Sequence, residues 1–123
     1  MAKSISIQKR KVVYKKYKGK CAYCGVKLDY SEMQVDHIIP KHRGSTNSEL
    51  SRYGISKGTN DIYNLNPSCG SCNSSKSTFT LDNWKKELEL KHQRLLNQNS
   101  SYRILNRFGV VRIKKEIRFH FEK

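Results

Sequence analysis

The chain has 123 residues and carries 25 lysines and arginines against 10 acidic residues, a formal net charge of +15. This length allows one domain with a modest core, because only 36% of the residues are hydrophobic. No apolar run approaches the roughly 18 residues of a spanning helix, and the first residues lack the apolar segment of a secretory signal. We therefore expect a single domain over 1–123, in a reducing cytoplasm, with a polyanionic partner: nucleic acid first and an acidic membrane surface second.

The N-terminal stretch is basic, and residues 5–18 are predicted to form a helix that Ser4 or Ser6 caps. The first 28 residues contain nine lysines or arginines and no acid. Such a cluster predicts a surface that contacts phosphates, although a solvated helix face would have the same composition. The residues chosen as nucleic-acid contacts here are Lys9, Arg10 and Lys11.

Two Cys-x-x-Cys pairs, with 44 residues between them, bracket the middle of the chain. Two residues between cysteines let a tight turn aim both thiolates at one tetrahedral ion. In a reducing compartment such pairs are better explained as metal ligands than as disulfides. We expect a structural zinc ion, which would stabilise a small core and leave no coordination position for catalysis. Its predicted ligands are Cys21, Cys24, Cys69 and Cys72.

Short strands are expected between the two pairs, at 26–28 and 33–39, and a proline follows the second of them. Residues 41–61 are polar and form a long loop, which is either functional or simply mobile. Lys41 and Arg43 help to make this loop basic, so its functional alternative is a contact with nucleic acid.

The chain after the second pair is predicted to be a helical and strand extension over 80–122. A helix should begin within the second pair, and Thr80 should then cap a longer helix that runs to about Asn97. A short helix follows. Alternating apolar residues from Val111 to Phe121 predict a strand, or a hairpin, with one buried face.

Polar residues occur in a particular order between and beside the cysteine pairs. Asp36 and His37 adjoin between the pairs, Asn64 lies five residues before the second pair, and Asn73 follows that pair directly. The pattern is a cysteine pair, Asp-His-Ile-x-Pro, a loop, Asn-Leu, a second cysteine pair, then Asn and a nearby Lys. It resembles the HNH endonuclease family, in a small phage-type member. The resemblance covers a motif core over 21–76, under half of the chain.

The resemblance implies an α+β fold, in which a ββα-metal nuclease core is stapled by the four-cysteine zinc site. Flanking helices and a C-terminal β segment would complete it. It also implies a metal-dependent enzyme that hydrolyses phosphodiester bonds of DNA, by nicking or by double-strand cleavage. The setting would be a bacterial host cell if a phage or mobile element encodes the chain. We expect a monomer or weak dimer without a membrane contact, and no surface for a phage packaging partner can be read from the sequence.

The same resemblance assigns roles to the residues that match the motif. His37 would activate water as general base. Asp36 and Asn73 match the positions that hold the catalytic ion, Mg²⁺ or Mn²⁺, through oxygen. Asn64 matches the central asparagine, which orients the base or braces the loop, and Lys76 is a candidate phosphate contact.

Two reservations follow from the residues themselves. Adjacent strand residues point to opposite faces, so Asp36 and His37 can share a site only if the strand bends or ends there. A function of another class, a non-catalytic zinc-stapled module that binds nucleic acid, would explain the cysteines and the charge. It would not explain the set of Asp, His and two Asn.

Overall fold

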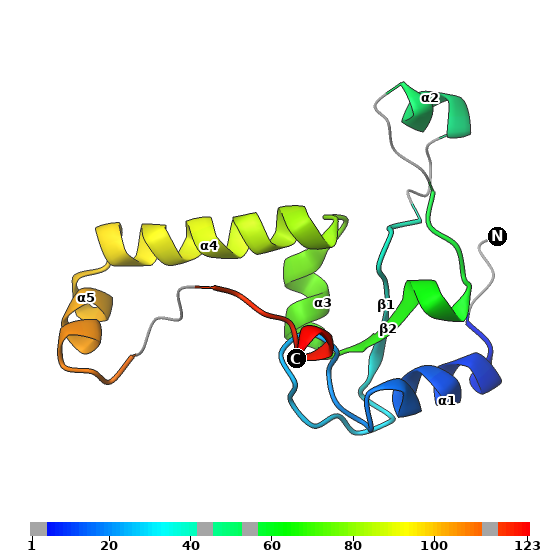
Figure 1. Ribbon diagram of the computed structural model, residues 1–123, viewed down its shortest axis with the longest axis horizontal. Helices are drawn as coiled ribbons and strands as arrows, with labels where there is room; N and C mark the ends of the chain where they lie inside the picture. The colour runs from blue at the N-terminus through cyan, green and yellow to red at the C-terminus, as the bar shows by residue number, and fades with distance from the viewer. Residues whose placement is uncertain (1–4, 42–45, 53–56, 112–115) are drawn as a thin grey trace.

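The computed structural model describes residues 5–41, 46–52, 57–111 and 116–123. Helix α1 contacts strand β2 and helix α3 contacts strand β1, so the strand pair lies between two helices (Figure 1). Helix α4 extends away from this core and α5 lies against its far end (Figure 1). The elements in chain order are α1 (Ile7–Lys16), β1 (Gln34–His37), α2 (Asn47–Ser51), the 3-10 helix η1 (Ile62–Asn64), β2 (Leu65–Ser68), α3 (Gly70–Lys76), α4 (Leu81–Gln98), α5 (Ser100–Arg107) and the 3-10 helix η2 (His120–Glu122).

The sheet consists of two antiparallel strands, β1 and β2, with Asp36 opposite Asn66. Every residue of β2 is buried, as expected for a strand between two helices. The first strand is shorter than the predicted 33–39, because the chain turns away after His37. The strand predicted over 26–28 was wrong, since Lys27 forms only an isolated bridge with Lys20.

Helix α1 has the features that the sequence indicated, although it is shorter than the predicted 5–18. The Ser6 hydroxyl caps it by accepting a hydrogen bond from the backbone N–H of Lys9, at 3.2 Å. The chain leaves the helix through Gly19, whose φ of 77° suits a residue without a side chain. Val13 is fully buried and fixes one face of the helix on the core.

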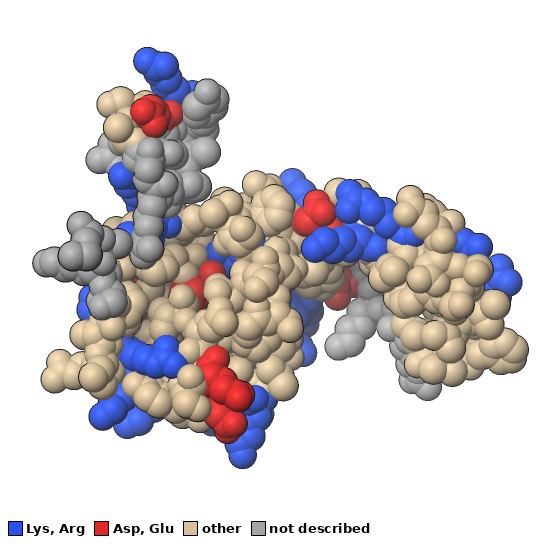
Figure 2. Space-filling view, turned by 180° about the vertical axis from the view of Figure 1, so that it is seen from behind, with Lys and Arg blue, Asp and Glu red and all other residues tan. Residues whose placement is uncertain are grey.

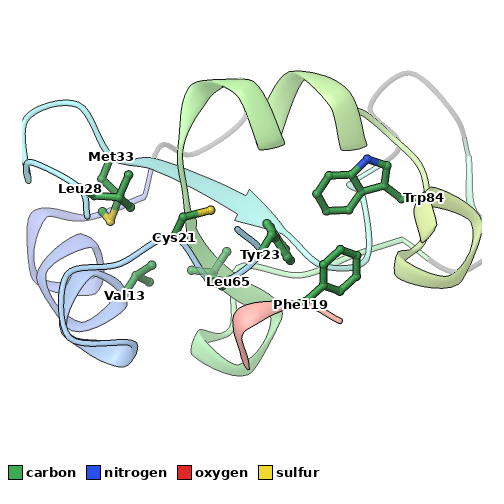
Figure 3. Packing of buried hydrophobic residues seen from close by; sticks show 9 residues of the cluster. Val13, Cys21, Tyr23, Leu28, Met33, Leu65, Trp84 and Phe119 are labelled. Carbon is green, nitrogen blue, oxygen red and sulfur yellow. The ribbon is translucent and has the colours of Figure 1, made fainter. Parts of the chain in front are cut away.

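The core is small and aromatic, as Figure 3 shows. The rings of Trp84 and Phe119 stack with centroids 4.9 Å apart, and the Tyr23 ring meets Trp84 edge-on at 5.1 Å. Aliphatic side chains continue the core towards α1 (Figure 3). Cys21 and Tyr23 lie within it, so the first cysteine loop begins in the packed interior, whereas Cys24 is exposed.

The two helices after the second cysteine pair agree with the sequence. The Thr80 hydroxyl caps α4 by accepting from the backbone N–H of Asn83, at 3.3 Å. The indole N–H of Trp84 donates to the Ser75 hydroxyl at 2.9 Å, which ties α4 to α3. The Asn99 side chain caps α5. Within the described ranges, no helix has the length and hydropathy needed to cross a bilayer.

The predicted C-terminal strand was wrong for the residues that the structure describes. Residues 112–115 lie outside the described ranges, and the chain from 116 onward is irregular before it enters η2. The alternation of apolar residues in this segment did indicate burial, since Phe119 is only 2% exposed. However, the backbone N–H groups of His120 and Phe121 donate to Tyr23 and Ala22 in the first cysteine loop, each at 2.9 Å. The partner is a turn, so no β-ladder forms.

Candidate active site and metal centre

The four cysteines meet although they come from two distant segments. Their sulfur atoms all lie within 4.8 Å of one another, and none forms a disulfide. The sulfurs of Cys24 and Cys69 are 3.8 Å apart. A tetrahedral ion with zinc–sulfur bonds of ~2.3 Å places its ligands about 3.8 Å apart, so the observed spacing fits zinc.

Local structure aims each pair at this point. In the first pair, the backbone N–H of Gly25 donates to the Cys21 carbonyl at 3.0 Å, and the φ of Gly25 is 79°. In the second pair, Cys69 is the N-cap of α3, and its sulfur accepts from the backbone N–H of Cys72 at 3.3 Å. A turn and a helix start thus present two sulfurs each.

The ionisation of the four cysteine thiols also favours a bound cation. A hydrogen bond from the Cys72 thiol lowers the pKa of Cys21 to about 4, and the same contact raises the pKa of Cys72. Four sulfurs this close cannot all ionise unless a positive ion lies among them. A thiophilic divalent cation resolves this conflict, which is a second reason to assign the cluster to structural zinc.

Asp36 is 4% exposed and is held by two side chains. The Tyr23 hydroxyl donates to Oδ2, and the Lys76 ammonium lies 3.3 Å from each carboxylate oxygen. Burial raises the pKa of Asp36, whereas the Tyr23 hydrogen bond and the positive charge of Lys76 lower it. The carboxylate therefore depends on these two partners to stay ionised inside the protein.

Lys76 has another role than the sequence indicated. Its side chain is fully buried, and its ammonium also donates to the His37 carbonyl at 2.9 Å. An ammonium enclosed in this way is not presented to a phosphate. We therefore interpret Lys76 as the counter-charge of Asp36 rather than as a nucleic-acid contact.

A chain of polar contacts leads from α1 to Asp36. The Lys16 ammonium donates to Asn66 Oδ1 at 3.1 Å, and the Asn66 amide donates to the Tyr23 hydroxyl at 3.4 Å. Tyr23 in turn donates to Asp36. Burial raises the pKa of Tyr23, so its hydroxyl keeps the proton that this chain requires. Sequence reasoning missed both Tyr23 and Asn66, because neither residue type marks a site.

His37 is the last residue of β1 and contacts a different part of the molecule. Its Nε2 lies 2.8 Å from Oδ1 of Asn60, and the Lys41 ammonium lies 3.5 Å from the same oxygen. Adjacent residues of a strand were expected to point to opposite faces, and the side chains of Asp36 and His37 indeed have different partners. Asp36 is turned towards Tyr23 and Lys76, and His37 contacts Asn60 near the end of the long loop.

Asn64 makes the contacts of a loop brace. Its side-chain amide donates to the carbonyls of Thr59, at 2.8 Å, and Ile39, at 3.2 Å, while its Oδ1 accepts from the Ile39 N–H at 2.9 Å. It therefore joins the two ends of the loop over 41–61. Gly58 passes so close that an added Cβ would lie 1.6 Å from the Ile39 carbonyl oxygen, which only glycine avoids.

Asn73 lies on α3, one turn before Lys76, and faces β1. Its amide nitrogen donates to Oε1 of Gln34 at 2.5 Å. Where α3 packs against β1, Asn73 therefore lies beside Gln34, and Lys76 lies beside Asp36. The oxygen donors that it contains, a carboxylate and a side-chain carbonyl, are of the kind that Mg²⁺ or Mn²⁺ takes. In this structure, the positive group next to Asp36 is Lys76.

Comparison with known proteins now decides the family of this segment. Residues 21–79 match the family model described as HNH endonuclease. This segment is an HNH endonuclease domain. Strands β1 and β2 followed by α3 are its ββα-metal unit, and the four cysteines are its zinc staple.

Two curated proteins match this HNH domain. The SPbeta prophage-derived candidate HNH endonuclease YoqL of Bacillus subtilis (strain 168) is 38% identical over 69 residues, 55% of this chain and 27% of its own. The CRISPR-associated endonuclease Cas9 of Corynebacterium diphtheriae is 32% identical over 72 residues, 58% of this chain and 5% of its own. The chain thus spans about a quarter or less of these relatives.

A solved structure shows the same fold. The crystal structure of the Type II-C Cas9 enzyme from Actinomyces naeslundii matches with a TM-score of 0.51 and 26% sequence identity. The match covers 65% of this chain and 8% of that one. The likeness supports the HNH arrangement of strands and helix described above.

The basic residues predicted to bind nucleic acid divide into two groups in this chain. Lys9 donates to the Asn60 carbonyl at 2.7 Å, and Arg10 donates to two backbone carbonyls at 2.7 Å. Lys11 is exposed, whereas Arg43 lies outside the described residues. Figure 2 shows further lysines and arginines spread over the core and the α4 arm, with few acidic groups among them.

Proposed function

We propose that this chain is a metal-dependent DNA endonuclease that hydrolyses phosphodiester bonds. The observation that carries the proposal is the zinc-stapled ββα unit within the matched segment, which ends β1 at His37 with the imidazole held in place. The net charge of +15 supports a polyanionic substrate. Both curated relatives carry the word endonuclease in their names.

In the proposed reaction, His37 is the general base. A neutral imidazole takes a proton from a water molecule as the water oxygen forms a bond to phosphorus. The bond between phosphorus and the leaving sugar oxygen breaks, and that oxygen takes a proton from solvent. Removing the base therefore removes proton transfer without removing a ligand of the zinc ion.

Asp36 and Asn73 would hold the divalent ion through their oxygen atoms. When bound, such an ion polarises the phosphoryl group and stabilises the leaving oxygen. The chain prepares both ligands. Tyr23 and Lys76 hold the buried carboxylate in its charged form, and Gln34 engages the amide nitrogen of Asn73, which leaves its carbonyl oxygen for the ion.

The test is incubation of supercoiled plasmid with the purified protein and Mg²⁺ or Mn²⁺. The control withholds the ion by dialysis, because a strong chelator would also compete for the structural zinc. Metal-dependent conversion to nicked or linear plasmid is the expected result, and the product distinguishes nicking from double-strand cleavage. Salt-sensitive DNA binding without cleavage at any metal concentration would favour the non-catalytic binding module instead.

The setting of this activity is also a proposal. The prophage origin of the Bacillus subtilis relative supports a bacterial host cell. We expect a monomer or weak dimer. A monomer carries one site and should nick one strand, so linear plasmid that appears only at high protein concentration would indicate that two copies act together.

A further inference from the structure

The hydrogen bond between His37 and Asn60 leaves one question open. Nε2 of His37 lies 2.8 Å from Oδ1 of Asn60. A ring nitrogen can donate or accept, and an amide can present oxygen or nitrogen, so this contact alone is compatible with two arrangements. In one of them Nε2 carries the ring proton. In the other, Nε2 is bare and accepts from the amide nitrogen.

Lys41 decides between these arrangements. Its ammonium lies 3.5 Å from the same atom of Asn60. An ammonium has only donors, so the amide atom that faces it must be the oxygen. The histidine nitrogen that faces this oxygen must then be a donor. In a neutral imidazole, Nε2 therefore carries the proton and Nδ1 is the nitrogen that can accept one.

The backbone around Asn60 is braced from two sides. Lys9 on α1 donates to the Asn60 carbonyl at 2.7 Å, and Asn64 donates to the preceding carbonyl, that of Thr59, at 2.8 Å. These contacts involve main-chain oxygens and leave the Asn60 side chain to His37 and Lys41. The amide is thus presented by a fixed segment and not by a freely moving side chain.

We propose that Asn60 is a positioning residue that holds His37 in the Nε2–H tautomer, with Nδ1 as the proton acceptor, and that Lys41 sets the orientation of the Asn60 amide. The proposal rests on the function proposed above. When Nδ1 takes a proton from water, the ring becomes a cation, and its hydrogen bond to Asn60 becomes charge-assisted and stronger. Asn60 therefore stabilises the product of proton transfer more than the resting ring.

Two substitutions separate positioning from simple support. Asn60→Leu has a similar size and offers no acceptor, so kcat should fall by about 10–100-fold, by analogy with the loss of groups that orient metal-bound histidines, with KM changed much less. Asn60→Asp offers only acceptors, which again require a proton on Nε2, and should recover most of kcat. Tyr63→Phe is the control from the same segment, because Tyr63 is 76% exposed and its hydroxyl donates to the exposed Asp61.

Nitrogen NMR of the imidazole provides a readout that does not depend on cleavage. The neutral ring of His37 in the zinc-loaded protein should show a protonated Nε2 and a bare Nδ1, and Asn60→Leu should show a mixture of tautomers. A wild-type ring protonated at Nδ1 would overturn the proposal, as would an Asn60→Leu enzyme with wild-type kcat. A wild-type protein with the expected tautomer but no cleavage would overturn the proposed function and leave the tautomer assignment standing.

Discussion

The hydroxyl of Tyr23, which lies between the two cysteines of the first zinc-binding pair, donates a hydrogen bond to the buried carboxylate of Asp36. The zinc loop and the proposed ion-binding acid are therefore in direct contact. Zinc would fix the loop, the loop places Tyr23, and Tyr23 holds Asp36. In this protein a zinc staple would thus support the geometry of the proposed active site as well as the stability of the fold.

Tyr23→Phe tests this connection. The change removes one hydroxyl and leaves a buried carboxylate short of a donor, which should lower the free energy of unfolding by about 1.5–3 kcal/mol. Denaturant unfolding at constant zinc content measures this change in the free energy of unfolding. Tyr63→Phe makes the same chemical change at an exposed site and should alter stability by less than about 0.5 kcal/mol. Equal effects of the two changes would show that the Asp36 contact contributes nothing.

Lys76→Met should be more damaging than the removal of a surface lysine. Lys76 is fully buried, so its loss leaves Asp36 as an uncompensated charge at a cost of about 3–5 kcal/mol. Asp36→Asn in the same molecule should restore much of the loss, because the remaining buried groups are then uncharged. Lys86→Met, on the exposed side of α4, is the control. A Lys76→Met protein as stable as the control would contradict the assignment of Lys76 as a counter-charge.

Loss of the zinc ion should unfold the domain rather than only inactivate it. Cys69→Ser removes one of four ligands in a protein with a small core, and binding in such sites contributes roughly 10–16 kcal/mol. Thermal melting, together with zinc analysis, should show a large drop in Tm. His37→Ala should melt close to wild type, since His37 is not a zinc ligand. A Cys69→Ser protein that keeps both its zinc and its Tm would contradict the assignment of the four cysteines as zinc ligands.

Exposed lysines of α1 are the better test of nucleic-acid contact, because Lys9 and Arg10 hold the fold together. Lys11→Glu with Lys15→Glu should weaken binding to all DNA sequences and reduce the slope of log K against log salt by about 1–2, given about 0.9 for each phosphate contact. Lys86→Glu with Lys91→Glu on α4 changes the net charge equally and should leave the slope nearly unchanged. Equal slopes for the two double variants would argue against a contact surface on α1.

The parts of the site that sequence reasoning found are those whose chemistry demands fixed residue types at fixed spacing. Four thiolates for one ion, and an acid beside a histidine, can be recognised in a string of letters. The sequence left two possible roles for Asn64, orienting the base or bracing the loop, because the same amide group can do either. The structure shows the bracing contacts of Asn64, and the residue that contacts His37 is Asn60.

The parts that were missed depend on contacts between distant residues. Asn60 is one of several polar residues in its segment, and nothing local distinguishes it. Counting charges does not reveal which ammonium groups face inward, so Lys76 and Lys9 were expected at the surface. The alternating apolar residues near the C-terminus indicated that one side of the chain is buried. A β-strand, however, also requires a neighbouring strand with which it can form hydrogen bonds. The partner there is the turn of the zinc loop.

Plasmid cleavage by His37→Ala, compared with wild type across a titration of Mg²⁺ and Mn²⁺, tests the central claim most directly. Asp36→Asn is the companion variant, because it weakens an ion ligand but keeps the volume of the buried side chain. The account predicts that His37→Ala binds DNA and zinc normally but cleaves about 10²–10⁴-fold more slowly, and that excess metal does not rescue it. Excess metal should partly rescue Asp36→Asn. Cleavage by His37→Ala at the wild-type rate would contradict the account.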